Sequence, residues 1–299
     1  MNLPKGVYID NLIADLKKFS WEASEILLYY SKKLEDPNFK NVILNKTDLN
    51  QPVTVADLKV NELIKKRIKE SYPEVCWDFL SEEDSKLEGK LFNPKYKWLW
   101  VLDPLDGTKD FIQCTGNYAM HLSLNFENKP MLGVVLIPER NELWISYSSK
   151  TYCYRNGISE VKLDLNSNKK LDNMRLITSK NHNNKLLSNL AARINFKDIG
   201  KMGSIGCKIA SILRREYDIY ISYSNPNGRT PKDWDFSAPA IILKSAGGSI
   251  TNLDNEELIY NKKGYKQGGF IIASNNKFTH KNICLELKQI ISKYKLLPS

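Results

Sequence analysis

The chain has 299 residues, of which 42% are hydrophobic and 10% aromatic. This composition is typical of a globular protein with one large domain or two of ordinary size, and it excludes a disordered chain. The formal net charge of +10 favours anionic ligands. The lysines are spread over the whole chain and no basic run exceeds three residues, so we expect no nucleic-acid partner.

The remaining global features concern the location of the protein. The longest apolar runs are strand-sized, which argues against a membrane span, and the N-terminus lacks the pattern of a secretory signal. The five cysteines are scattered without a C-x-x-C pair and resemble buried or free thiols of a reducing compartment. We therefore expect a cytoplasmic protein.

The first half of the chain predicts two helices followed by strands. Apolar residues recur at helical spacing from residue 7 to about 30, and a second helical pattern covers 58–70 after a polar, turn-rich stretch. "EVCWDFLSEED" (74–84) resembles a buried strand that runs into acidic residues. "YKWLWVL" (96–102) predicts another strand, which ends at Asp103.

A meander of antiparallel strands is predicted next. "YAMHLSLNF" (118–126) alternates cleanly and places Tyr118, Met120 and Leu122 on one face. "MLGVVLIP", "NELWISYSS" and "TYCYRNG" follow after short turns. His121 falls on the polar face of its strand, so we expect it at the surface or in the lining of a cleft.

The polar stretch "DLNSNKKLDN" (164–173) is the best domain boundary, and we predict an N-terminal domain over 1–168 and a C-terminal domain over 169–299. After it, strands and helices alternate. Strands are predicted at 175–180, 218–224, 249–253 and 268–274, and helices near 183–193 and at 204–217, 234–248 and 280–294. We expect a layered α/β (α+β) fold with an antiparallel meander in the first domain and a mixed sheet in the second.

The most informative motif is "VLDPLDGT". A hydrophobic strand ends at Asp103, Pro104 keeps the chain extended, and Asp106 follows three residues later, so both carboxylates can converge on one point. Gly107 and Thr108 would begin a helix, whose first amides are a favourable site for phosphate. Carboxylates beside a phosphate require a cation between them, and oxygen-only ligands select Mg²⁺, Mn²⁺ or Ca²⁺.

A simpler interpretation is a tight Asp-Gly turn with Asp106 as a helix cap, which needs no metal. We expect Asp110 to be an ordinary helix-surface charge. Further acidic groups lie at the ends of predicted elements and shift the interpretation toward a metal site: Glu82 and Glu83 in "SEED", Asp57 after "PVTVA", and Asp233 and Asp235 in "DWD". Each has a simple interpretation as a cap or a solvated strand end. Together they suggest a metal cluster completed from both domains.

The motifs "SEED", "LDPLDGTKDF" and "DWDFSAPAIILKSAGG" resemble, in order and spacing, those of the inositol monophosphatase-like, Mg²⁺-dependent, lithium-sensitive phosphatase superfamily. The resemblance covers roughly residues 5 to 275. Lys109 after "DGT" and the stretch "KTDLNQPVTVAD" look most like the bacterial bisphosphate nucleotidases. The resemblance implies removal of the 3′-phosphate from 3′-phosphoadenosine 5′-phosphate, a by-product of sulfate assimilation, to give AMP and phosphate.

The resemblance also implies metal ligands, for two or three Mg²⁺ ions. The first ion would be held by Glu82, Asp103 and the carbonyl of Leu105. The second would be held by Asp103, Asp106 and Asp235. A third, weaker position would lie between Glu82 and Asp57.

Catalytic and substrate-binding roles follow from the same resemblance. Asp57 and Thr108, with Glu82, would orient and activate the water for in-line attack, without a phosphoenzyme. The substrate-binding residues implied are Gly107, Thr108, Lys109, Lys208 and Asp235. Lys208, with Arg229 and Lys232, is a candidate for the second phosphate, and solvated surface charge is an equal interpretation for each of them.

One departure from the family pattern is Pro239, which follows the "DWD" motif. Because proline cannot donate a helical hydrogen bond, we expect this helix to begin a turn later than in relatives, capped by Ser237.

Two alternative functions remain open. One is inositol monophosphatase or fructose-1,6-bisphosphatase activity, and the other is a non-catalytic nucleotide-binding protein on the same fold. We expect a small anionic phosphate substrate, no integral membrane segment, and a monomer or homodimer.

Overall fold

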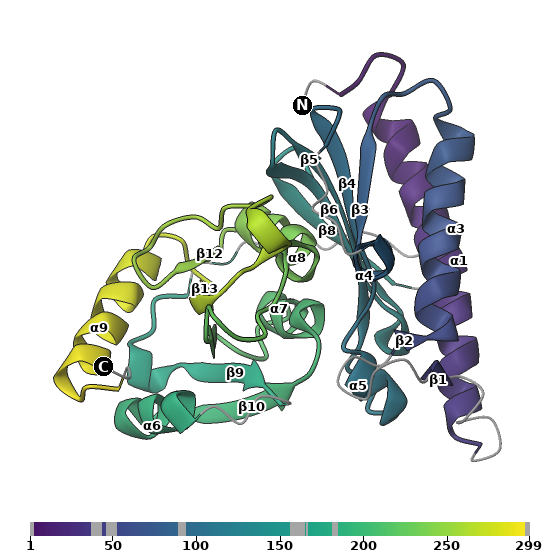
Figure 1. The fold of residues 1–299 in the computed structure, drawn as a ribbon. Helices are drawn as coiled ribbons and strands as arrows, with labels where there is room; N and C mark the ends of the chain where they lie inside the picture. The colour runs from purple at the N-terminus through teal and green to yellow at the C-terminus, as the bar shows by residue number, and fades with distance from the viewer. Residues whose placement is uncertain are drawn as a thin grey trace.

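The computed structural model describes residues 3–36, 44–45, 53–88, 94–155, 165, 167–180 and 185–296. Its elements form alternating layers (Figure 1). Helices α1 and α3 cover one face of a six-stranded sheet, and α7 and α8 lie between this sheet and a five-stranded one. Helices α6 and α9 cover the outer face of the second sheet.

The elements before residue 155 build the first sheet and its outer helices. Their bounds are α1 Ile9–Leu34, β1 Leu44–Asn45, β2 Val53–Thr54, α3 Val55–Ser71, β3 Asp78–Ser81, α4 Glu82–Glu88, β4 Trp98–Asp106, α5 Thr108–Ile112, β5 Ala119–Phe126, β6 Lys129–Ile137, a 3-10 turn Pro138–Arg140, β7 Glu142–Tyr147 and β8 Lys150–Tyr154.

The later elements build the second sheet and the remaining helices. Their bounds are a 3-10 turn Leu171–Asn173, β9 Arg175–Ser179, α6 Lys185–Ile194, β10 Asp198–Met202, α7 Ile205–Leu213, β11 Ile219–Ser224, α8 Asp233–Ser245, β12 Ser249–Asn252, a 3-10 turn Lys263–Tyr265, β13 Gly269–Ser274 and α9 His280–Lys293.

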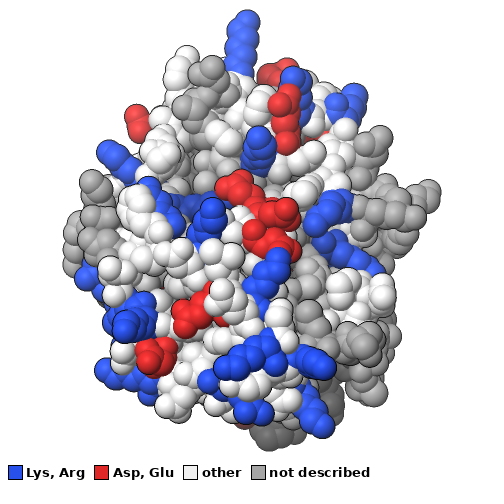
Figure 2. Space-filling view, turned by 90° about the vertical axis from the view of Figure 1, so that its left-hand side faces the viewer, with Lys and Arg blue, Asp and Glu red and all other residues white. Residues whose placement is uncertain are grey.

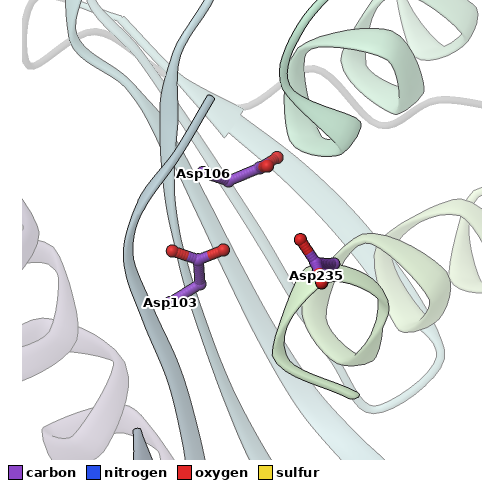
Figure 3. A group of neighbouring side chains, drawn as sticks. All are labelled: Asp103, Asp106 and Asp235. Carbon is purple, nitrogen blue, oxygen red and sulfur yellow. The ribbon is translucent and has the colours of Figure 1, made fainter. Parts of the chain in front are cut away.

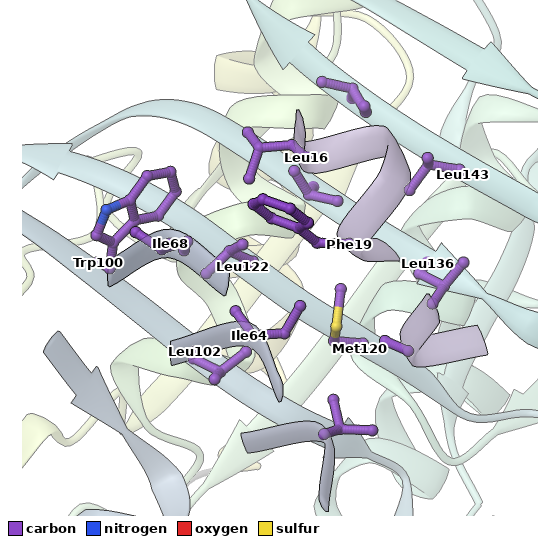
Figure 4. Packing of buried hydrophobic residues seen from close by; sticks show 14 of the residues in the cluster. Leu16, Phe19, Ile64, Ile68, Trp100, Leu102, Met120, Leu122, Leu136 and Leu143 are labelled. Carbon is purple, nitrogen blue, oxygen red and sulfur yellow. The ribbon is translucent and has the colours of Figure 1, made fainter. Parts of the chain in front are cut away.

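The core of the first sheet lies between its strands and helices α1 and α3 (Figure 4). This core includes Leu16 and Phe19 of α1, Ile64 of α3, and Met120 and Leu122 of β5, and all five side chains are buried. Each such side chain contributes on the order of 2 kcal/mol of burial free energy. Both predicted helices are confirmed, although the second begins at residue 55, three residues earlier than expected, because Thr54 caps it.

The six-stranded sheet has the order β3-β4-β5-β6-β7-β8. Its strands from β4 to β8 pair antiparallel in succession, so the predicted meander is confirmed, while β3 pairs parallel to β4. The second sheet has the order β10-β9-β11-β13-β12 and contains parallel and antiparallel pairs, which confirms the mixed sheet. Strand β10 was not predicted from the sequence, because its residues do not alternate in hydrophobicity.

The boundary predicted at residue 168 falls between β8, the last strand of the first sheet in sequence, and β9, the first strand of the second. Helices α7 and α8 lie after this boundary in sequence. Their apolar side chains nevertheless share one core with residues of β5, β6 and β7. The two parts of the chain are therefore joined through these helices.

The expected late start of the "DWDFSAP" helix is wrong. Helix α8 begins at Asp233, contains Pro239, and has Asp235 bonded to the Lys232 amide at its first turn. Ser237 does not cap it. Its hydroxyl instead accepts a hydrogen bond from Ser123 and donates one to Asn125 of β5. Tertiary contacts of the helix thus outweigh the local cost of the proline.

Lysine and arginine side chains are distributed over the whole face shown in Figure 2, with small acidic groups between them. This face carries no single basic stripe of the kind expected for a nucleic-acid interface. Among the described helices, none is long and apolar enough to cross a membrane.

Candidate active site

A bulge in β4 places Asp103 and Asp106 on the same face of the first sheet. In a regular strand, residues three apart point to opposite faces. Here Asp103 pairs with His121 and Asp106 pairs with Ala119, so three steps along β4 match two steps along β5. Pro104 and Leu105 supply the extra residue of the bulge, a position at which proline is tolerated.

Asp235 approaches the two strand carboxylates from the first turn of α8. Its Oδ2 accepts a hydrogen bond from the Lys232 backbone amide at 2.5 Å, at the N-terminus of this helix. The interpretation of Asp235 as a helix cap is therefore correct, but it is incomplete. Figure 3 shows that the Asp235 carboxylate also faces Asp103 and Asp106 across the space between β4 and α8.

The three carboxylates form a group that is able to hold a metal ion. One oxygen from each of Asp103, Asp106 and Asp235 lies within 4.8 Å of the others. Asp103 is 1% exposed and Asp106 8% exposed. The structure thus brings together the three aspartates predicted for the second ion.

The electrostatics of this cluster favour a cation. Burial, followed by the charges of Glu82, Asp106 and Asp235, raises the pKa of Asp103 well above its usual range. Burial and the charge of Asp106 raise the pKa of Asp235 in the same way. Among the described residues, Asp103 Oδ2 is a buried oxygen without a hydrogen-bond partner. A cluster of buried carboxylates that repel one another, with one oxygen of Asp103 left without a donor, fits a hard divalent cation.

Glu82 and Asp57 extend the acidic group. Glu82 begins α4 and is one of the charges that raise the pKa of Asp103. Asp57 is 1% exposed, and burial, followed by the charge of Glu83, raises its pKa to about 8. Asp57 also accepts hydrogen bonds from the backbone amide and hydroxyl of Thr54, which makes it the partner of the N-cap Thr54 in the capping box of α3. The stretch 46–52 that supported the bisphosphate nucleotidase resemblance lies outside the described residues.

The turn after the bulge begins α5 as predicted. Gly107 is the N-cap with φ of 91°, a conformation that favours glycine, and an added Cβ would lie 2.9 Å from the Asn117 carbonyl oxygen. The Thr108 hydroxyl donates to the Leu105 carbonyl oxygen at 3.1 Å. Lys109 is exposed in the first turn. Gly107, not Asp106, therefore caps this helix.

The N-terminus of α7 holds Asp106 in place. Asp106 Oδ2 accepts hydrogen bonds from the Ser204 hydroxyl at 2.7 Å and from the amides of Ile205 and Gly206. Ser204 also caps α7 by accepting from the Cys207 amide. The sequence does not predict the contact between Ser204 and Asp106, because the two residues lie almost a hundred positions apart.

Two residues near the site differ from expectation. His121 is fully buried, with Nε2 3.3 Å from Asp106 Oδ2, rather than at the surface. Asp110 is fully buried as well. It accepts a hydrogen bond from Thr115, and Gly203 packs so closely that an added Cβ would overlap its carboxylate. The second half of the chain covers the polar face of β5 and the face of α5 that bears Asp110. The local sequence does not reveal this covering.

Lys208 is fully buried in α7 and is not a solvated charge. Its ammonium donates to the carbonyls of Gly203 at 2.7 Å and Met202 at 3.3 Å. Burial lowers the pKa of Lys208, while nearby carboxylates led by Asp106 oppose that shift. The role of Lys208 toward a second phosphate stays a prediction. Of the other two candidates, Lys232 donates to the Gly264 carbonyl and Arg229 is exposed.

The layer order and the convergent carboxylates define a layered α/β protein with a candidate metal centre between its two sheets. More particularly, the sequence matches the Inositol monophosphatase family over residues 10–292, and the chain belongs to that family.

Relatives within the family carry different names. The chain is 29% identical to the 3′(2′),5′-bisphosphate nucleotidase CysQ of Buchnera aphidicola over 240 residues, which cover 78% of this chain and 80% of the relative. It is 26% identical to the Nus factor SuhB of Vibrio cholerae, with coverages of 83% and 86%. The fold resembles an IMPase structure from Thermotoga maritima with a TM-score of 0.72 at 20% identity, covering 95% of this chain and 99% of that one.

Proposed function

We propose that this protein is a Mg²⁺-dependent phosphomonoesterase that removes the 3′-phosphate of 3′-phosphoadenosine 5′-phosphate. The observation that carries the metal-dependent chemistry is the convergence of Asp103, Asp106 and Asp235 within 4.8 Å, with the buried Asp103 Oδ2 lacking a hydrogen-bond partner among the described residues. The choice of substrate rests on the similarity to CysQ relatives. We take the protein to act in the cytoplasm as a monomer or homodimer.

The acidic residues would bind two or three Mg²⁺ ions. Glu82, Asp103 and the Leu105 carbonyl would hold one ion, Asp103, Asp106 and Asp235 a second, and Glu82 with Asp57 a weaker third. Bound Mg²⁺ supplies positive charge for the transferred phosphate and makes a neighbouring water a better nucleophile. Burial and then the neighbouring carboxylates raise the pKa values of Asp103 and Asp235, and this supports the assignment, because a bound cation would offset both effects.

The other residues of the site would orient the reactants. Amides of Gly107 and Thr108, at the start of α5, would receive the scissile phosphate. Thr108 and Asp57 would orient the attacking water, with Thr108 placed by its hydrogen bond to Leu105. Lys109, exposed in the same turn, and the buried Lys208 are the cations proposed for the second phosphate of the substrate.

The reaction class is tested by phosphate release with Mg²⁺ and with EDTA. We expect activity only with Mg²⁺, and we expect Asp103→Asn to lower kcat at least a hundredfold because it removes a shared ligand. Asp172→Asn is a matched control, since Asp172 is an exposed aspartate outside the cluster. Full activity of Asp103→Asn would disprove the assignment, and an inert unmodified protein would favour the non-catalytic alternative.

The substrate is tested with a panel at equal concentrations. We expect the highest kcat/KM for 3′-phosphoadenosine 5′-phosphate, compared with inositol 1-phosphate and fructose 1,6-bisphosphate. A preference for the inositol ester would replace our choice of substrate and leave the metal chemistry intact. The similarity to SuhB at nearly the same identity makes this comparison necessary.

A further inference from the structure

Helix α8, which carries Asp235, packs against the polar face of β5. Ser123 donates to the Ser237 hydroxyl at 2.7 Å, and that hydroxyl donates to Asn125 at 3.0 Å. Two residues before Ser123 on the same face, His121 Nδ1 lies 3.4 Å from the carbonyl oxygen of Trp234. The three β5 side chains thus contact α8 in a row, and His121 contacts it next to the metal-binding residue Asp235.

His121 also touches the other elements that form the acidic cluster. Its Nε2 lies 3.3 Å from Asp106 Oδ2 at the end of β4. Gly206 of α7 packs against the same ring edge, where an added Cβ would lie 2.3 Å from Nε2. The fully buried ring therefore fills the junction of β4, α7 and α8.

We propose that His121 is a positioning residue that sets the separation of Asp106 and Asp235 and so prepares the acidic cluster for its cation. None of the family motifs in the sequence includes this residue. The inference rests on the metal centre of the proposed function and adds to it a residue outside the ligand set.

The hydrogen-bond chemistry explains how the ring would act. A carbonyl oxygen only accepts, so Nδ1 carries the proton in the contact with Trp234. Asp106 Oδ2 already accepts hydrogen bonds from Ser204 and from the amides of α7, which fixes the position of Asp106. The hydrogen bond from His121 to the Trp234 carbonyl would fix the position of the neighbouring Asp235. Without the ring, two repelling carboxylates would be free to move apart, and the cation would have to bring them together again.

The test measures Mg²⁺ binding in the absence of substrate. Purified full-length protein is titrated with MgCl₂, and the Mg²⁺ Kd is obtained from calorimetry and from the Mg²⁺-dependent rise in melting temperature. We expect His121→Ala to weaken Mg²⁺ binding about tenfold or more, as is typical for loss of a group that orients a metal ligand. Ser123→Ala is the matched control, because it removes a neighbouring contact with α8 that does not reach the cluster, and we expect a Kd within twofold of the parent.

Two conservative variants separate the contacts of the ring. His121→Asn places an amide donor near the Nδ1 position and is expected to bind Mg²⁺ within threefold of the parent. His121→Gln places its donor near the Nε2 position, away from Trp234, and is expected to bind as weakly as the alanine variant. The comparison of the Asn and Gln variants also tests the role of His121 if His121→Ala does not fold.

The inference is overturned if His121→Ala binds Mg²⁺ within twofold of the parent, or if Ser123→Ala weakens binding to the same extent. Equal Kd values for the Asn and Gln variants would overturn it as well. Failure of the proposed function gives a different result: the unmodified protein would show no Mg²⁺-dependent rise in melting temperature, and Asp103→Asn would behave identically to it.

Discussion

Asp103 uses its two carboxylate oxygens differently. Its Oδ1 accepts a hydrogen bond from the Leu105 amide at 3.1 Å, whereas Oδ2 is buried without a partner among the described residues. Burial, followed by the carboxylates around it, raises its pKa, so a charge on Asp103 destabilises the metal-free site. Asparagine keeps the acceptor at Oδ1 and removes the charge.

We therefore predict that Asp103→Asn raises the melting temperature in EDTA while it abolishes the rise caused by Mg²⁺. A gain of about 1 kcal/mol corresponds to roughly 2–4 °C for a protein of this size. Differential scanning calorimetry with EDTA and with MgCl₂ measures both effects. A lower melting temperature of the variant in EDTA would show that repulsion in this cluster is negligible.

The role of Lys109 can be measured separately from that of the metal-binding residues. It is exposed in the first turn of α5, next to the amides assigned to the scissile phosphate. We predict that Lys109→Ala raises KM for 3′-phosphoadenosine 5′-phosphate about fivefold, or about 1 kcal/mol of binding, and raises KM for 3′-AMP less than twofold. Equal increases for both substrates, measured by phosphate release, would place Lys109 at the scissile phosphate instead.

At the scale of elements, the close approach of β6 and α8 controls the position of Asp235. Gly133 of β6 has no side chain, and an added Cβ would lie 2.5 Å from Ile241 Cγ2 and 2.9 Å from the Ala238 carbonyl oxygen. A larger residue at this position would push the helix away from the sheet.

We predict that Gly133→Ala destabilises the protein by about 1–3 kcal/mol, as overpacking does, and also weakens Mg²⁺ binding because α8 carries Asp235. Gly228→Ala is the control, since the atom nearest to its added Cβ is 3.5 Å away. Urea denaturation and Mg²⁺ titration measure the two effects. Unchanged Mg²⁺ affinity in a destabilised Gly133→Ala variant would contradict this coupling.

The elements themselves were largely predictable from the sequence. Helices α1 and α3 and the meander follow from hydrophobic periodicity, since each buries one face against the same core. Helix α8 was predicted with the wrong start, because Ser123 and Asn125 of a distant strand engage Ser237 and the helix tolerates Pro239. The local sequence shows the cost of a proline inside a helix, but it does not show the tertiary contacts that offset this cost.

At the scale of the whole molecule, a buried histidine makes folding stability depend on pH. His280 begins α9 and is 1% exposed, with ring nitrogens 2.7 Å from the Ser274 hydroxyl and 2.8 Å from the Thr251 hydroxyl. Burial lowers its pKa from 6.5 to about 4. The unfolded chain therefore binds the proton more readily than the folded protein does between these two values.

Stability from this group is complete above pH 6.5 and is lost as the pH falls toward 4. We predict that the wild type loses roughly 3 kcal/mol more than His280→Gln between pH 7.5 and pH 4, because glutamine does not titrate. Chemical denaturation at both pH values gives the difference. Parallel losses in the two proteins would show that His280 does not contribute to acid sensitivity.

The sequence by itself determined the fold class, most elements and the acidic residues of the site, because hydrophobic periodicity and short motifs are local properties of the chain. Only the tertiary structure decided how those residues converge. The β4 bulge turns Asp103 and Asp106 to one face, α8 brings Asp235 within 4.8 Å of them, and α7 fixes Asp106. The same packing fully buries Asp110, expected at a helix surface, and His121 and Lys208, for which a surface position was one of two alternatives. Burial and distance depend on segments that lie far apart in the sequence, such as Asp106 and Ser204, and no local pattern records them.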